Sequence, residues 1–151
     1  MSQSLSAVYL HLVFSTKNRF PFLHDHDMRQ AAFACLSGTS KKLDCPTITV
    51  GGMSDHVHIL ARFSRTISQA DWVKELKRVT NGWLKKQRPQ VSKFEWQSGY
   101  AAFSVSQSSL AHVRKYINEQ ETHHRRFGFQ DELRILLRKH QIDFDEQYVW
   151  G

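Results

Sequence analysis

Residues 47–63 read TITVGGMSDHVHILARF, and this stretch decides the fold. It is rich in β-branched and apolar residues, which favour extended strands. The pairs Gly51-Gly52 and Ser54-Asp55 interrupt it with residues that favour turns. The stretch therefore predicts a β-hairpin whose strands lie near 46–51 and 56–63.

Two further strands and two helices are expected around this hairpin. Before it, the hydrophobic pattern predicts a strand at 8–15 and a helix at 26–40, with Gly38 at the helix end. After it, an amphipathic helix that stops at Pro89 precedes a short strand at 99–106. The predicted order is thus strand, helix, two strands, helix and strand.

The last part of the chain predicts more helices. Ser108 or Ser109 caps a third helix that reaches about His124, and residues 131–140 predict a fourth, followed by an irregular tail. We therefore expect an α+β protein. Its fold class is a ferredoxin-like (RRM-like) βαββαβ sandwich with an antiparallel sheet and extra C-terminal helices.

Length and hydropathy limit the organisation of the chain. Its 151 residues predict a single domain over 1–151, with a core at about 5–126 and a C-terminal helix and tail at 129–151. No window approaches the roughly 18 apolar residues that a membrane helix needs. The first residues lack the basic segment of a signal peptide. We therefore expect a cytoplasmic protein with no membrane partner.

The charge distribution indicates a polyanionic partner. The formal net charge is +7. Residues 129–151 hold three basic and five acidic side chains, so the excess positive charge lies in residues 1–128. Five basic residues lie on the amphipathic helix that Thr66 or Ser68 caps, and we predict that they contact DNA phosphates: Lys74, Lys77, Arg78, Lys85 and Lys86.

The first candidate site is His56-Val57-His58 on the second strand of the hairpin. Side chains alternate between the faces of a strand, so the two imidazoles project from one face while Val57 and Ile59 turn to the other. Two imidazoles at this spacing can bind one metal ion, although two half-exposed strand histidines would give the same pattern. A metal site here needs a third ligand.

The second candidate site is Tyr116 with Gln120 on the third predicted helix. The i, i+4 spacing puts the phenol and the amide on one helical face, one turn apart. Basic residues crowd the same segment: Arg114, Lys115, His123, His124, Arg125 and Arg126. We expect this cationic surrounding to favour the ionised phenol. The alternative is a packed tyrosine beside a solvated, basic helix end.

Taken together, these motifs resemble the single-tyrosine HUH transposases, which move insertion sequences as single-stranded DNA. The group also includes the REP-associated tyrosine transposases. The resemblance spans essentially the whole chain and rests on four segments that occur in order: HLVFSTKNRFPFL, VGGMSDHVHILARF, FEWQSGYAAFSVSQS and VRKYINEQETHH. His56-Val57-His58 matches the His-hydrophobic-His motif, and Tyr116 with Gln120 matches the family's nucleophile and third ligand.

The resemblance implies a mechanism and its residues. His56, His58 and Gln120 would bind a divalent metal, Mg²⁺ or Mn²⁺, and Tyr116 would attack single-stranded DNA at hairpin ends. The attack would leave a 5′-phosphotyrosine and a free 3′-OH, so that strands can later be rejoined without ATP. Family members work as homodimers with composite active sites, in which the tyrosine helix of one subunit can complete the site of the other.

The sequence leaves three other interpretations of the function open. A non-catalytic nucleic-acid-binding module of the RRM type would share the fold and the basic surface, but the chain lacks an RNP1-like run. A related HUH enzyme that nicks DNA for replication or conjugation usually carries a further domain. An insertion-sequence transposase and a host-adopted REP-associated transposase would look alike.

Overall fold

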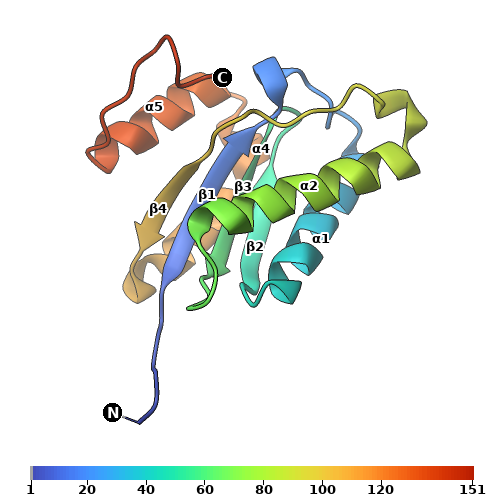
Figure 1. The fold of residues 1–151 in the computed structure, drawn as a ribbon. Coiled ribbons are helices and arrows are strands. Elements are labelled where there is room, and N and C mark those ends of the chain that lie inside the picture. Colours follow the sequence, from blue (N-terminus) through green and yellow to red (C-terminus); the bar gives the residue numbers. More distant parts are fainter. Residues whose placement is uncertain (1) are drawn as a thin grey trace.

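Four strands form one antiparallel sheet in a computed structural model that describes residues 2–151 (Figure 1). They are β1 (Tyr9–Ser15), β2 (Thr47–Gly52), β3 (His56–Arg62) and β4 (Ala101–Val105). Their order across the sheet is β2-β3-β1-β4, and every neighbouring pair is antiparallel. This is the sheet of a ferredoxin-like sandwich, so the predicted fold class is confirmed.

The turn of the predicted hairpin depends on Gly52. Its φ is +147°, and a Cβ atom there would lie 2.2 Å from the carbonyl oxygen of His56. Only glycine tolerates both the backbone conformation and the close approach. The turn therefore fixes the point at which β3 begins and, with it, the position of His56.

Two helices cover one face of the sheet, namely α1 (His26–Lys42) and α2 (Gln69–Gln87) (Figure 1). They are capped by Asp25 and Ser68, whose side chains accept hydrogen bonds from backbone N–H groups of the first turn. The main core lies between them and the sheet and includes Phe14, Val57, Ile59, Trp72 and Leu76.

The predicted end of the first helix is wrong. Gly38 takes no left-handed conformation, and α1 continues to Lys42. The chain reverses instead at Asp44, which has a φ of +61°. An aspartate tolerates this conformation better than most residues, because its short side chain can hydrogen-bond locally.

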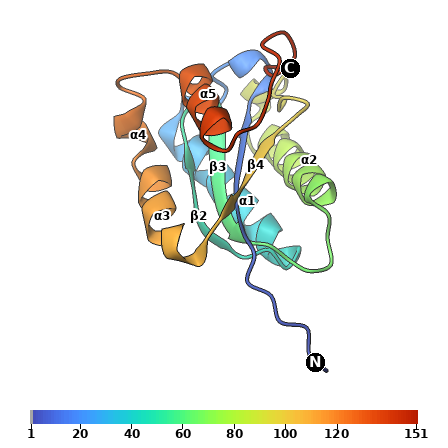
Figure 2. The same cartoon turned by 90° about the vertical axis from the view of Figure 1, so that its left-hand side faces the viewer.

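Three helices lie on the other face of the sheet: α3 (Leu110–Asn118), α4 (Gln120–His123) and α5 (Phe129–Lys139) (Figure 2). The sequence predicted one helix as far as His124, but the helix breaks at Glu119 (φ −101°, ψ 21°). The break rotates the following turn, and Gln120 becomes buried. Buried hydrogen bonds of the Gln120 amide favour this rotated position over a continuous helix.

Helix α5 packs on the sheet through a second, smaller core. This core consists of Val13 and Phe103 from the strands and Phe129, Leu133 and Leu137 from α5. Three short 3₁₀ helices complete the described secondary structure: η1 (Lys17–Arg19), η2 (Pro89–Val91) and η3 (Gln107–Ser109). Within residues 2–151, no helix combines the length and the apolar character that crossing a bilayer requires.

Candidate metal and nucleophile site

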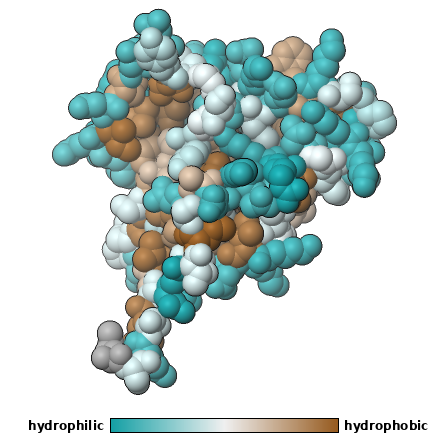
Figure 3. Space-filling view, in the orientation of Figure 1, coloured by the Kyte–Doolittle hydropathy of each residue, from teal (hydrophilic) through white to brown (hydrophobic). Residues whose placement is uncertain are grey.

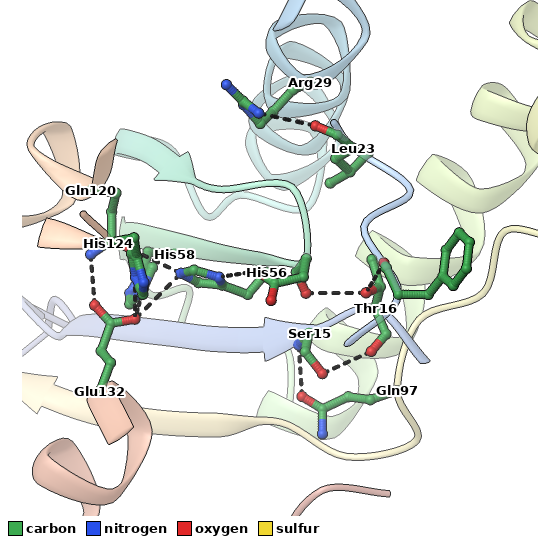
Figure 4. Close-up of polar contacts among 12 residues, drawn as sticks. Ser15, Thr16, Leu23, Arg29, His56, His58, Gln97, Gln120, His124 and Glu132 are labelled. Atoms are coloured by element: carbon green, nitrogen blue, oxygen red, sulfur yellow. Dashed lines mark hydrogen bonds and ion pairs between the residues drawn. The ribbon is translucent and has the colours of Figure 1, made fainter. Parts of the chain in front are cut away.

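His56 and His58 project from β3 toward α3, α4 and α5, and both are fully buried (Figure 4). Val57 and Ile59 point into the core on the other face, as the strand pattern predicted. The Nδ1 atom of His56 lies 2.8 Å from Oδ1 of Asp55, and Nδ1 of His58 lies 2.8 Å from Nε2 of His11. Asp55 and His11 thus fix the two rings through their Nδ1 atoms, and both Nε2 atoms face the same space.

Gln120 reaches the same space from α4. Its Oε1 atom lies 2.9 Å from Nε2 of His56, and its side chain is buried. The structure therefore brings together the three residues for which the resemblance implied a metal role. An imidazole that is fixed through its second nitrogen is the usual form of a metal-ligating histidine.

A fourth group, the carboxylate of Glu132 of α5, contacts all of these side chains from the α5 side (Figure 4). Its Oε1 atom lies 3.0 Å from Nε2 of His58, 3.3 Å from Nε2 of His56 and 3.1 Å from Nε2 of His124. Its Oε2 atom accepts a hydrogen bond of 2.8 Å from Nε2 of Gln120. Glu132 is the only buried carboxylate among the residues that the structure describes.

Tyr116 of α3 completes the cluster. Its hydroxyl donates a hydrogen bond to Oε2 of Glu132, and its ring centroid lies 5.8 Å from that of His58, nearly perpendicular to it. The candidate nucleophile and the candidate metal ligands thus meet within one chain. Both contact the same carboxylate.

Burial, hydrogen bonds and charge shift the pKa values of the cluster in different directions. Burial disfavours charge on His56, but hydrogen bonds and charge from Asp55 and Glu132 outweigh it and raise the pKa to about 9. Burial dominates at His58 and lowers its pKa. Burial also opposes charge on Glu132, yet hydrogen bonds from His124, His56 and His58 bring its pKa far below the usual range.

The expectation of an ionised phenol does not hold in this arrangement. Burial raises the pKa of Tyr116, and the charge and hydrogen bond of Glu132 raise it further. The phenol is therefore neutral while it contacts Glu132.

The side chains of this cluster fit a divalent cation. His56, His58 and Glu132 each offer a ligand atom, and these atoms lie within 4.8 Å of one another. Gln120 adds an amide oxygen on the same side. Two imidazole nitrogens and two oxygens suit an ion of intermediate hardness, such as Mn²⁺, and can also hold Mg²⁺.

The predicted DNA-contacting residues of α2 do not join the cluster. Helix α2 packs on the opposite face of the sheet, and its solvent side is mostly hydrophilic (Figure 3). The Lys77 ammonium donates hydrogen bonds to the carbonyls of Gln97 (2.8 Å) and Gly99 (2.7 Å), and burial lowers its pKa to about 8. Arg78 forms an exposed ion pair with Glu75. Lys74, Lys85 and Lys86 lie on the same helix.

Four polar residues of the site were not assigned from the sequence: His11, Asp55, His124 and Glu132. The alternating pattern of β1 places His11 on the same sheet face as Val13, which was a usable signal. Asp55 precedes the histidine motif directly. Glu132 carries no such local signal, since its role depends on how α5 packs.

The comparisons with known proteins agree with this geometry. Residues 4–120 match the family model described as Transposase IS200 like. A candidate transposase of Deinococcus radiodurans R1 is 22% identical, with a TM-score of 0.64 over 78% of this chain and 93% of its own. A REP-associated tyrosine transposase bound to a REP hairpin is 13% identical, with a TM-score of 0.60 over 82% of this chain and 74% of its own.

At these identities the two structures show a shared fold, and no curated protein matches the sequence significantly. The family model covers well over half of the chain and includes β1 to β4, Tyr116 and Gln120. The chain belongs to the family of IS200-like transposases.

Proposed function

We propose that this transposase cleaves and rejoins single-stranded DNA through a 5′-phosphotyrosine on Tyr116. The observation that carries the proposal is the shared contact of the Tyr116 hydroxyl and the Nε2 atom of His58 with one carboxylate, that of Glu132. A nucleophile and metal ligands that converge on one anion are arranged as a phosphoryl-transfer reaction requires.

His56, His58 and Gln120 would hold the divalent ion, Mg²⁺ or Mn²⁺. When bound, such an ion supplies Lewis-acid stabilisation of the charge that grows on the phosphate oxygens. Asp55 and His11 fix the orientation of the two imidazoles.

The chemistry conserves the energy of the phosphodiester bond. The Tyr116 oxygen forms a bond to phosphorus while the bond from phosphorus to the 3′ oxygen breaks, and the leaving strand ends in a 3′-OH. A 3′-OH from another strand can later attack the phosphotyrosine and release Tyr116. Strands can therefore be exchanged without a nucleotide cofactor. Such an exchange of strands is the chemistry of DNA transposition.

The DNA partner is proposed to be a single strand with hairpin ends. A structural neighbour is described as bound to a REP hairpin, which supports this choice of partner. A host-adopted REP-associated role is the second candidate, favoured by the same neighbour. The DNA that flanks the gene distinguishes the two, because an insertion sequence is bounded by its own hairpin ends.

We further propose that the protein acts as a homodimer, because joining two DNA ends requires two active sites held together. Tyr116 already contacts the site of its own chain. A composite site would need α3 and α4 of a partner subunit to take the same position.

The proposed function is tested with single strands that carry the two sequences flanking the gene, labelled at the 5′ or the 3′ end. We expect wild-type protein with Mg²⁺ or Mn²⁺ to cut one position and to retain the 3′-labelled fragment covalently. EDTA and the variant His58→Ala should abolish cutting. A product with a 5′ phosphate and no adduct would indicate a water nucleophile and contradict the proposal.

A further inference from the structure

A groove leads from the surface to the candidate site. Helices α3 and α5 form its walls and β4 forms its floor, on the face shown in Figure 2. The cavity has a volume of about 690 Å³. Tyr116, Glu132 and His11 line it, whereas His56, His58 and Gln120 do not. From the groove, the Glu132 carboxylate therefore stands in front of the two metal-binding histidines.

The other polar residues of the groove suit the phosphate groups of a DNA backbone. Lys139 lies at its α5 wall and His112 at its α3 wall. Across the described part of the chain, Glu132 is the only acidic residue that lines it. Phe103 and His140 stack on each other with a centroid separation of 4.4 Å and form an aromatic part of its lining.

The Glu132 carboxylate makes the contacts that a scissile phosphate must make. One oxygen faces Nε2 of His58, where a phosphate oxygen would meet the ion, and the other accepts the hydrogen bond of the Tyr116 hydroxyl. A phosphate and a carboxylate are both anions with oxygens on one central atom. Two such anions cannot share this buried space, because their charges repel each other.

We propose that the scissile strand enters through this groove and that its phosphate takes the place of the Glu132 carboxylate. In the DNA-free protein, Glu132 is an anionic ligand of the metal site and hydrogen-bonds to Tyr116. When DNA binds, the carboxylate moves aside, because either α5 shifts or the Glu132 side chain rotates. This inference rests on the proposed function and adds the path of the substrate and the group that it displaces.

Two charge changes on α5 test the displacement. Glu132→Gln keeps the shape of the buried side chain but removes its charge, and Asp131→Asn removes the same charge from the exposed neighbouring position. Both are made in a Tyr116→Phe background, so that the probe is not cut. The probes are Mn²⁺ alone, followed by electron paramagnetic resonance, and a 30-nucleotide single strand of mixed sequence, followed by fluorescence anisotropy with Mn²⁺ present.

Glu132→Gln should weaken Mn²⁺ binding without DNA by about tenfold or more, as expected for the loss of a charged ligand. It should strengthen binding of the single strand about three- to tenfold, because no anion has to be displaced. Asp131→Asn should change each value less than twofold. Unchanged or weaker DNA binding by Glu132→Gln would overturn the displacement, even if Mn²⁺ binding falls. If Glu132→Gln does not fold, Glu132→Asp provides a second test, because the shorter side chain should no longer reach the space that the phosphate takes.

A second pair of variants tests the groove itself. Lys139 lines it, whereas the adjacent, exposed Arg138 does not. Lys139→Glu should weaken binding of the single strand several-fold more than Arg138→Glu, although both change the net charge equally. Equal effects would show that the strand takes another path. A wild-type protein that forms no phosphotyrosine adduct would refute the proposed function, but these binding comparisons would still decide the path.

Discussion

The Nε2 atom of His11 lies 2.8 Å from the Nδ1 atom of His58, so a buried residue of β1 holds a metal-ligand candidate of β3. Burial and the neighbouring His58 keep the pKa of His11 well below its ordinary value. A neutral His11 can accept the Nδ1 proton of His58. In this structure Nε2 of His58 donates to Glu132, so binding of a metal at Nε2 requires its proton to move to Nδ1, where His11 can accept a hydrogen bond from it.

Removal of this support should weaken metal binding. We expect His11→Ala to lower the affinity for Mn²⁺ by about 10- to 100-fold, the range found for partners of metal-ligating histidines. The measurement is a Mn²⁺ titration followed by electron paramagnetic resonance. His112→Ala, an exposed change on α3, serves as the control and should leave the affinity unchanged. Equal affinities for the two variants would show that His11 does not position His58.

Gly51 allows α3 to lie close to the sheet. A Cβ atom at Gly51 would come within 2.6 Å of the carbonyl oxygen of Ile117, the residue that follows Tyr116. Gly51→Ala should therefore push α3 outward and lower the cleavage rate at least tenfold, because a displacement of about 1 Å can cost 10²-fold in rate. Mn²⁺ affinity should change much less, since His56 and His58 lie on β3.

The matched control is Gly82→Ala on α2. No atom lies within 4 Å of a Cβ at Gly82, so the change should raise stability by about 0.5–1 kcal/mol and leave cleavage unchanged. Thermal unfolding and single-turnover cleavage measure both quantities. A Gly51→Ala protein that cleaves at the wild-type rate would show that this close approach does not matter.

The sequence predicts those parts of the site that depend on local periodicity. Strand alternation places His56 and His58 on one face, and helical spacing brings Tyr116 and Gln120 together even though the helix breaks between them. Element order alone predicts the sheet, because short connections leave few topologies for this pattern.

Other features depend on tertiary packing and could not be predicted in this way. Glu132 and His58 are 74 positions apart in the sequence, and they come into contact only because α5 packs on β1 and β4. The amphipathic pattern of α2 shows which side of the helix is buried, but not which face of the sheet it covers. Its basic residues therefore lie on the face opposite to His56.

Stability of the metal-free protein should depend on the protonation of His56. Its folded pKa of about 9 exceeds the ordinary value of 6.5, so the charged form stabilises the fold. This contribution is complete below about pH 6.5 and is lost as the pH rises through 9. We expect the Tm in EDTA to fall between pH 6.5 and 9.

The variant Asp55→Asn removes one of the groups that raise this pKa, and should reduce the fall in Tm. Asp71→Asn removes the same charge from the exposed start of α2 and should leave the pH dependence as in the wild type. Thermal unfolding at four pH values is sufficient. A Tm that rises steadily over this range would contradict a charged His56.

Contact between Tyr116 and the site of its own chain predicts the result of a mixing experiment. Tyr116→Phe and His56→Ala are each expected to be inactive. When the two proteins are mixed under conditions of proven subunit exchange, we expect no recovery of cleavage. Recovery would show that the Tyr116-bearing helix completes the site of the partner subunit. The mass of the wild-type protein from light scattering, expected to be that of a dimer, provides the reference.

The most direct test of the central claim identifies the residue that becomes joined to DNA. Wild-type protein is incubated with Mn²⁺ and a single strand that carries the flanking hairpin, digested, and examined by mass spectrometry. We predict a nucleotide attached through its 5′ phosphate to the peptide that contains Tyr116. Tyr116→Phe should give no adduct while it binds the strand within about threefold of the wild type, because only the phenolic oxygen is lost. A nucleotide attached to any other residue, or an adduct that persists in the Phe variant, would contradict the account.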